Sequence, residues 1–189
     1  YGDPASWLEG DQWDSIMNYD AFMEPVTWFL TGMEKHSDSY NGGIWGDGEA
    51  FFNAMGYHMS RMQTNTVMTA MNQLSNHDHS RFLTRTNQMV GRIQTAGPEK
   101  AGQNIKPCVF REAVVIQMTW PGAPTLYYGD EAGVCGWTDP DSRRTYPWGK
   151  EDLELIEFHR YMTGIHCKIP AIRKGAVKPL LAGYQKIAY

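Results

Sequence analysis

The sequence has few cysteines and no long apolar run. Its 189 residues include only three cysteines, Cys108, Cys135 and Cys167, and no Cys-x-x-Cys pair. Such scattered thiols argue against a disulfide framework and against a thiolate zinc site, and they favour a reducing, cytoplasmic location. No apolar stretch reaches the roughly 18 residues that a membrane helix needs, and no basic-then-apolar leader opens the chain, so we expect no membrane partner.

An excess of basic charge is also absent. Lys and Arg number 17 against 21 Asp and Glu, which gives a net charge of −4. A nucleic-acid surface needs a basic stripe, so we expect no nucleic-acid partner. With 42% apolar and 20% charged residues, the composition is that of a globular chain with one sizeable core.

Aromatic residues, by contrast, are frequent at 13% of the chain. Many stand among Gly, Asp and Pro rather than in periodic runs, where their faces would suit stacking against a sugar. The alternative for any single Trp is ordinary packing in the core or at its edge, which is the more common role. The tryptophans concerned are Trp7, Trp13, Trp45, Trp120, Trp137 and Trp148.

Strand-like and helix-like segments alternate along the chain. The expected strands cover 14–18, 70–76 and 124–128, and further β structure begins in 176–189. The expected helices cover 20–33, 49–71, 104–120 and 151–167, with loops at 37–48 and 91–103. Strands that alternate with helices predict a parallel sheet with crossover helices, an α/β fold.

Local signals support two of these helices. In 49–71 a spacing of three and four places five side chains on one face: Phe51, Met55, His58, Met59 and Met62. In 104–120, Asn104 is the candidate N-cap and Pro107 lies in the first turn. The strand at 124–128 is expected to be buried.

Polar clusters follow each of the three expected strands, as Met17-Asn18-Tyr19, Asn76-His77-Asp78 and Gly129-Asp130-Glu131. In parallel barrels, functional side chains project from the carboxyl ends of strands, so these tips are expected at one cleft. Asp130 and Glu131 are expected to fix loops there rather than to do chemistry.

The Asn76-His77-Asp78 cluster has two further interpretations. On turn chemistry alone, it is a strand-end turn capped by the Asn side chain. His77 and His79 flank Asp78 and suggest a metal site, but a ligand set needs further placed donors, so no metal is expected.

Four segments resemble the α-amylase family of glycoside hydrolases, and they occur in that family's order. "SNHDHSRFLT" (75–84) resembles the seventh-strand motif, and 113–148 resembles the eighth-strand region with its Asp-Pro-Asp-x-Arg-Arg stretch. Residues 7–19 resemble the passage into strand six, and 169–180 the passage into the next domain. The branch most similar is that of neopullulanase, cyclomaltodextrinase and maltogenic amylase. His79 departs from the pattern, because related sequences tend to have Thr there.

The resemblance implies a fold and a reaction. Residues 1–168 would be the C-terminal portion of a catalytic (β/α)8 TIM barrel, with strands six to eight, and 169–189 the start of a C-terminal β-sandwich domain. The reaction would be retaining hydrolysis of α-1,4 links in starch, maltooligosaccharides or cyclodextrins, without a cofactor. The family's Asp nucleophile and Glu acid/base have no match in the chain, so we expect a fragment that is inactive alone.

Site roles follow from the same resemblance, residue by residue. Asp78 matches the family's third catalytic carboxylate. The substrate-binding candidates are Asn76, His77, Asp139, Arg143 and Tyr1, the last as an aromatic platform on the leaving-group side. For Asp139 and Arg143 the alternative is a surface ion pair worth about 0–1 kcal/mol.

Two further expectations concern assembly and class. A truncated barrel leaves open strand edges, which predicts that another copy, another segment or rearranged loops cover them, so a homo-oligomer is one outcome. The alternative function is that of a non-catalytic barrel relative, acting as a binding or transporter-associated subunit. The His77-Asp78 pair favours the enzyme, because a scaffold has no need of it.

Overall fold

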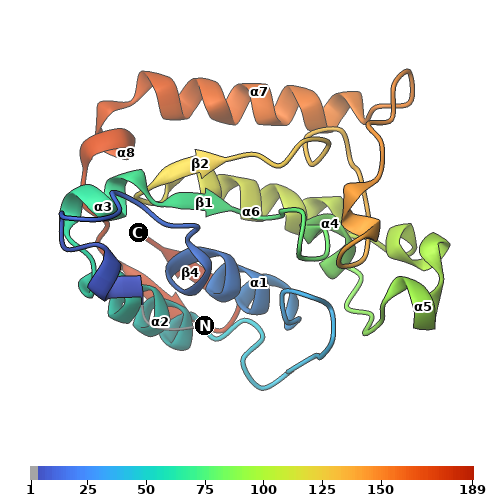
Figure 1. Ribbon diagram of the computed structural model, residues 1–189, viewed down its shortest axis with the longest axis horizontal. Helices are drawn as coiled ribbons and strands as arrows, with labels where there is room; N and C mark the ends of the chain where they lie inside the picture. Colours follow the sequence, from blue (N-terminus) through green and yellow to red (C-terminus); the bar gives the residue numbers. More distant parts are fainter. Residues whose placement is uncertain (1–3) are drawn as a thin grey trace.

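Three short parallel segments form the centre of the protein in the computed structural model, which describes residues 4–189 (Figure 1). Strand β1 (Met71–Gln73) pairs in parallel with β2 (Ala123–Thr125), with Asn72 opposite Pro124. Met17 forms an isolated parallel bridge to Met71. The predicted parallel order is therefore confirmed, although each segment is shorter than expected and the first is a single bridge.

Buried polar side chains fix the register of these segments. Asn72 is fully buried, and its Oδ1 accepts a 2.8 Å hydrogen bond from Asn18 while its Nδ2 donates to the Pro121 carbonyl at 2.9 Å. Gln117 donates to the Asn72 carbonyl at 2.9 Å. A Cβ at Gly122, which has φ of +136°, would lie 2.3 Å from Asn72 Nδ2, so only glycine fits. Hydrogen bonds between buried polar groups thus hold the starts of the strands together.

Helices surround the strands on both sides. In Figure 1, α7 and α2 lie at opposite sides of the molecule, with β1, β2 and α6 between them. Between Met17 and β1 lie a π-helical turn (Tyr19–Met23), α1 (Glu24–Thr31), α2 (Gly48–Ser60) and α3 (Thr64–Thr69). Between β1 and β2 lie α4 (Phe82–Arg85), α5 (Ile93–Ala96), a 3-10 turn (Pro98–Gly102) and α6 (Pro107–Thr119). After β2 come α7 (Leu153–Lys168) and α8 (Pro170–Lys174), and further 3-10 turns cover Pro4–Trp7 and Asp141–Arg143.

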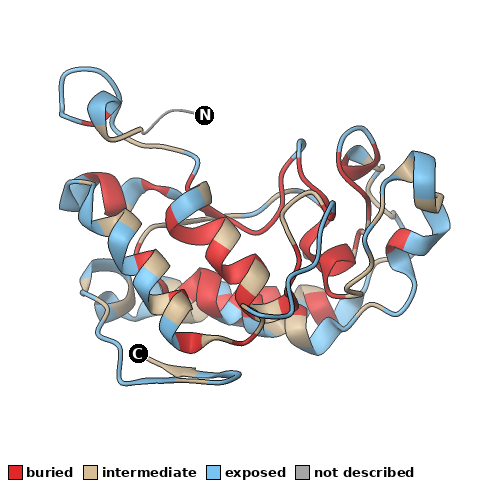
Figure 2. Ribbon diagram, turned by 90° about the horizontal axis from the view of Figure 1, so that it is seen from below, coloured by how far each residue is buried: buried red, intermediate tan, exposed pale blue. Residues whose placement is uncertain are grey.

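The core lies where α1, α2 and α6 meet the strands, and Figure 2 shows the buried residues gathered there. Phe51 of α2 is its centre, with ring centroids 4.9 Å from Phe29 and 5.7 Å from Trp120. Such aromatic pairs contribute about 0.5–1.5 kcal/mol each beyond the burial of their area. This core holds the strands in place from one side and leaves their carboxyl ends free for the site.

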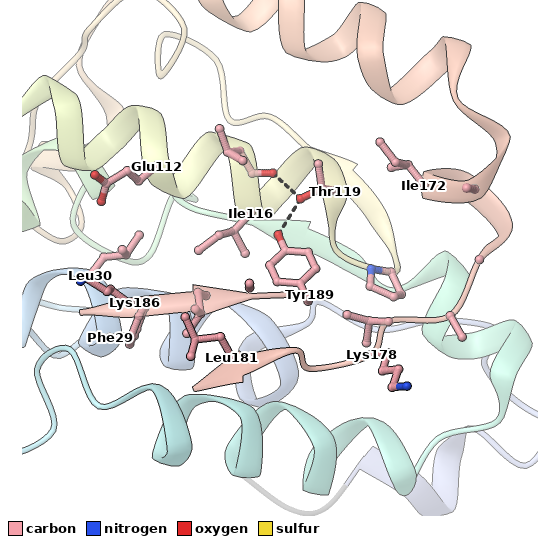
Figure 3. A pocket seen from close by; sticks show the side chains of 18 of the residues that line it. Phe29, Leu30, Glu112, Ile116, Thr119, Ile172, Lys178, Leu181, Lys186 and Tyr189 are labelled. Atoms are coloured by element: carbon pink, nitrogen blue, oxygen red, sulfur yellow. Dashed lines mark hydrogen bonds between the residues drawn. The ribbon is translucent and has the colours of Figure 1, made fainter. Parts of the chain in front are cut away.

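A hairpin ends the chain. Strands β3 (Leu181–Gly183) and β4 (Lys186–Ala188) pair antiparallel, as the β-rich segment 176–189 predicts, whereas helix α8 before them was not predicted. Between the hairpin, α6 and α8 lies a groove of about 940 Å³. Figure 3 shows Tyr189 pointing across it to Thr119 of α6, with their hydroxyl oxygens 2.6 Å apart.

Two helix predictions are wrong in their limits. The helix expected over 49–71 ends at Ser60, and Arg61–Gln63 separate α2 from α3, because Gln63 takes an extended backbone conformation (φ −64°, ψ 150°) from which a new helix starts. Asn104 is not an N-cap: it has φ of +54°, and α6 begins at Pro107 after Lys106. Proline favours the first helical position, and asparagine tolerates positive φ, which accounts for the shift.

Two other predictions also need correction. The segment 91–103 is not a plain loop but contains α5 and a 3-10 turn, because Thr95 Oγ1 accepts a 3.0 Å bond from the Arg92 N–H and starts the short helix. The strand expected to be buried at 124–128 is β2, which lies slightly earlier and is only partly buried. Within residues 4–189, none of the helices has both the length and the apolar character needed to cross a membrane.

Candidate active site

The Asn76-His77-Asp78 turn follows β1 and is built by the Asn76 side chain. Its Oδ1 accepts hydrogen bonds from the Asp78 N–H at 2.9 Å and the His79 N–H at 3.0 Å, and its Nδ2 donates to the Tyr19 hydroxyl at 3.1 Å. Asn76 is buried. The capped turn is therefore present, and it brings the first and second polar tips together. That Asn76 touches substrate stays a prediction.

His77 and Asp78 project from this turn toward solvent. Their side chains are 48% and 53% exposed, and His77 Nε2 lies 3.3 Å from Asp78 Oδ1. Both groups are thus adjacent and accessible, while the backbone beneath them is fixed by Asn76. This arrangement can offer a carboxylate and an imidazole to one bound molecule.

The segment after β2 holds the same turn from the other side. The Asp78 carbonyl accepts a hydrogen bond from Thr138 Oγ1 and a 3.2 Å bond from the Asp139 N–H. Ser142 Oγ donates to the His77 carbonyl at 2.8 Å. Residues about 60 positions apart in the sequence therefore form one unit, and the position of Asp78 depends on both.

Asp139 and Arg143 form an ion pair next to this unit, with both side chains about half exposed. The hydrogen bond to Asp139 raises the pKa of Arg143, and the nearby charge of Asp78 adds to that effect. The structure thus brings both predicted substrate-binding residues to the neighbourhood of Asp78. That they bind a sugar, rather than only each other, stays a prediction.

The third polar tip is buried behind the site. Arg81 Nη1 lies 2.9 Å from Asp130 Oδ1, with side-chain exposures of 0% and 6%. Arg81 also donates to the carbonyls of Tyr128 and Ser142, at 2.7 and 2.9 Å. Burial raises the pKa of Asp130, and the positive charge of Arg81 opposes that rise. Asp130 thus fixes the loops, as expected, and does not share the cleft of the other two tips.

A groove of about 1070 Å³ leads to Asp78 along the 15–19 segment. Its lining includes Tyr57 and His58 of α2, Met71 of β1, and Asp78 of the Asn76-His77-Asp78 turn. Tyr19, Asp20, Lys35, His36 and His79 line the same groove. Lys35, His36 and the supporting Thr138 were missed from the sequence. A Lys-His pair before a Gly-rich loop is the only signal there, and it does not reveal a contact made 102 residues away.

His79 lies under this groove as a buried, uncharged ring. Its ring meets Tyr19 and His36 in edge-to-face contacts, with centroids 5.0 and 4.6 Å apart. Burial first, and then the positive charge of Arg85, lower the pKa of His79 to about 3. The ring is therefore neutral near pH 7. Among the side chains of residues 4–189, no group of three His, Cys, Asp or Glu is arranged to hold a metal ion.

The burial of His79 predicts a loss of stability in mild acid. An unfolded histidine titrates near 6.5, whereas His79 titrates at about 3 when folded, so between these values the unfolded state binds more protons and stability falls as the pH falls. From pH 7 to pH 5, the free energy of unfolding should drop by about 2 kcal/mol more in the parent than in His79→Asn. Denaturant titrations of the full-length protein at both pH values measure this difference. Equal drops in the two proteins would show that His79 charges freely in the folded state.

The tryptophans divide between the two roles considered for them. Trp120 and Trp137 are buried, which is the ordinary packing role. Trp7 and Trp13 are exposed and stacked with centroids 5.4 Å apart, and Trp148 is 81% exposed. Tyr1, predicted as an aromatic platform, lies outside the described residues.

Comparison with known proteins finds a family model that matches most of the chain. The family described as "Alpha amylase, catalytic domain" matches residues 3–166. The chain is 33% identical over 189 residues to Neopullulanase 2 of Thermoactinomyces vulgaris, covering 99% of this chain and 27% of that protein. It is 32% identical over 186 residues to Amylopullulanase of Thermoanaerobacterium thermosulfurigenes, covering 96% of this chain and 10% of that protein.

Solved structures of similar fold cover almost the whole chain as well. The chain superposes on the debranching enzyme of Nostoc punctiforme with a TM-score of 0.76 and 29% identity, over 98% of this chain and 36% of that one. The chain therefore spans 10% to 27% of the length of these two curated relatives. Both relatives are named as pullulanases, and each is several times longer than this chain.

Proposed function

The chain belongs to the alpha-amylase catalytic domain family, and on this premise we propose that it is part of an enzyme that hydrolyses α-1,4 links in α-glucans with retention of configuration. Its substrates would be starch, maltooligosaccharides or cyclodextrins, and no cofactor is required. The observation that carries the proposal is the accessible His77–Asp78 pair, 3.3 Å apart, of which Asp78 lines the groove beside β1.

The proposed architecture follows from the same premise. Residues 1–168 supply strands six to eight of a (β/α)8 barrel with their helices, and residues 169–189 begin a C-terminal β-sandwich. The parallel Met17, β1 and β2 segments support the first part, and the antiparallel β3–β4 hairpin supports the second.

In the proposed mechanism, Asp78 is not the nucleophile. A retaining glycosidase uses two carboxyl groups about 5–5.5 Å apart, and its transition state is cationic at the sugar ring. We assign those two groups to parts of the protein outside residues 1–189. Asp78 accepts hydrogen bonds from sugar hydroxyls and stabilises the positive charge as it develops, and His77 donates a hydrogen bond to the same sugar.

Neighbouring residues orient Asp78 and extend the site. Asn76, Thr138 and the Asp139 N–H hold the backbone on both sides of the carboxylate, so its position needs no rearrangement during reaction. Asp139 and Arg143 extend the site toward the glycone end of the sugar chain. The exposed Trp13 lines the groove, stacks on Trp7 and is available for stacking on a sugar.

The experiment that tests the proposal compares two proteins. Release of reducing sugar from maltotriose, soluble starch and a cyclodextrin is measured for the full-length protein and for residues 1–189 alone. We expect turnover by the former and none above a boiled control by the latter, because losing catalytic groups of this kind costs several orders of magnitude. Turnover by the short chain that Asp78→Asn abolishes would overturn the assignment of the two missing groups.

A further inference from the structure

A short segment with no assigned role lies beside Asp78. Residues Glu34–Asp38, here called the His36 strap, run along the turn that follows β1. The Lys35 carbonyl accepts hydrogen bonds from the N–H and the hydroxyl of Ser80, at 3.2 and 3.0 Å, and Ser37 Oγ lies 2.9 Å from Ser80 Oγ. Asp38 forms an ion pair with Arg92 at the far end. The strap is thus fixed to the same turn that carries His77 and Asp78.

The proton on His36 can be placed from its contacts. His36 Nδ1 lies 3.0 Å from Thr138 Oγ1. The Thr138 hydroxyl has one proton, and it donates that proton to the Asp78 carbonyl. Thr138 Oγ1 must therefore accept from His36, so Nδ1 carries a hydrogen. In the neutral ring, Nε2 is then a lone-pair acceptor.

That nitrogen has no partner among the described residues, and His36 lines the groove. Within residues 4–189, His36 Nε2 has no hydrogen-bond partner, whereas Nδ1 has one. His36 lines the same groove as Asp78, and its ring packs edge-on against the buried ring of His79, which limits its rotation. A fixed acceptor in the groove that Asp78 also lines calls for a ligand that donates, such as a hydroxyl group.

We propose that His36 is a substrate-binding residue whose Nε2 accepts a hydrogen bond from one hydroxyl of the glucose unit bound at Asp78. This inference rests on the proposed function and adds a residue to its site. Because Thr138 links His36 to the Asp78 backbone, the contact also ties recognition of that hydroxyl to the position of the carboxylate.

The test uses substrates that lack single hydroxyls. Values of kcat/KM are measured for the full-length enzyme on a p-nitrophenyl maltoside and on analogues with one hydroxyl replaced by hydrogen. The parent should lose about 3- to 10-fold on one analogue through this contact, as expected for one net hydrogen bond. His36→Asn keeps a donor toward Thr138 but has no atom at the Nε2 position, so it should no longer distinguish that analogue from the complete substrate.

Two further variants separate binding from support of the fold. His36→Gln places an amide near the Nε2 position and should regain part of the discrimination. Ser37→Ala loosens the strap at Ser80 without changing the ring, and it should affect all analogues equally. If His36→Asn keeps the parent's pattern of discrimination, the inference is wrong while the proposed function stands. If the parent turns over none of these substrates, the proposed function fails, and this inference fails with it.

Discussion

Asp78→Asn in the full-length protein should lower kcat by about 10²–10³ or more and change KM little. The amide keeps the size of the side chain and much of its hydrogen bonding but removes its charge. That charge matters most when the sugar ring becomes cationic, so the transition state loses more than the bound substrate does. The Asn76 and Thr138 contacts go to the Asp78 backbone, and they remain in the variant.

Arg143→Ala is the contrasting variant for the same measurement. Arg143 lies at the surface, paired with Asp139, and as a subsite contact it would act on ground state and transition state alike. It should therefore raise KM with kcat nearly unchanged. Steady-state kinetics on a series of maltooligosaccharides measure both variants. A kcat for Asp78→Asn within a few-fold of the parent would make the residue structural and the site assignment wrong.

Asp130→Ala should cause the largest loss of stability, about 3–5 kcal/mol in the free energy of unfolding. The change leaves the guanidinium of Arg81, with 0% side-chain exposure, without its counter-ion. The two carbonyl partners of Arg81 satisfy some of its N–H groups but do not neutralise its charge. Because Arg81 and Ser142 support the Asp78 turn, catalysis should fall as well.

Glu157→Ala is the matched control for that measurement. Glu157 pairs with Arg160 on the surface of α7, and each side chain is 67% exposed. An exposed pair of this kind contributes about 0–1 kcal/mol, so the variant should unfold at nearly the denaturant concentration of the parent. Denaturant titration followed by circular dichroism compares the two. Similar small losses in both variants would show that Arg81 relaxes to solvent when Asp130 is removed.

Periodic and motif signals in the sequence predicted much of the fold. The parallel order of the strands followed from alternation of strand-like and helix-like segments, and helix α7 was predicted to within two residues. The predicted ends of helices and strands were wrong where long-range contacts outweigh the local sequence pattern. Gly122 and the buried Asn72 set the start of β2, and no property of residues 124–128 taken alone reveals that contact.

In the candidate site too, some residues could be identified from the sequence and others only from the structure. Asp78 and His77 were singled out as candidates because a strand end and a family motif coincide in a few adjacent residues. The contact between His36 and Thr138 was missed because it joins positions 102 residues apart in the sequence. For Asn76, turn chemistry alone predicted a cap at the strand end, and the structure confirms it, because Asn76 Oδ1 accepts from the Asp78 and His79 N–H groups.

The measurement that tests the central claim most directly is proton NMR of maltotriose hydrolysis by the full-length protein. The anomeric proton of the newly formed reducing end is followed from the first minutes, before mutarotation mixes the anomers. The proposal predicts that the α-anomer forms first and that Asp78→Asn removes the signal over the same period. First appearance of the β-anomer, or no new reducing end at all, would contradict a retaining α-glucan hydrolase with Asp78 in its active site.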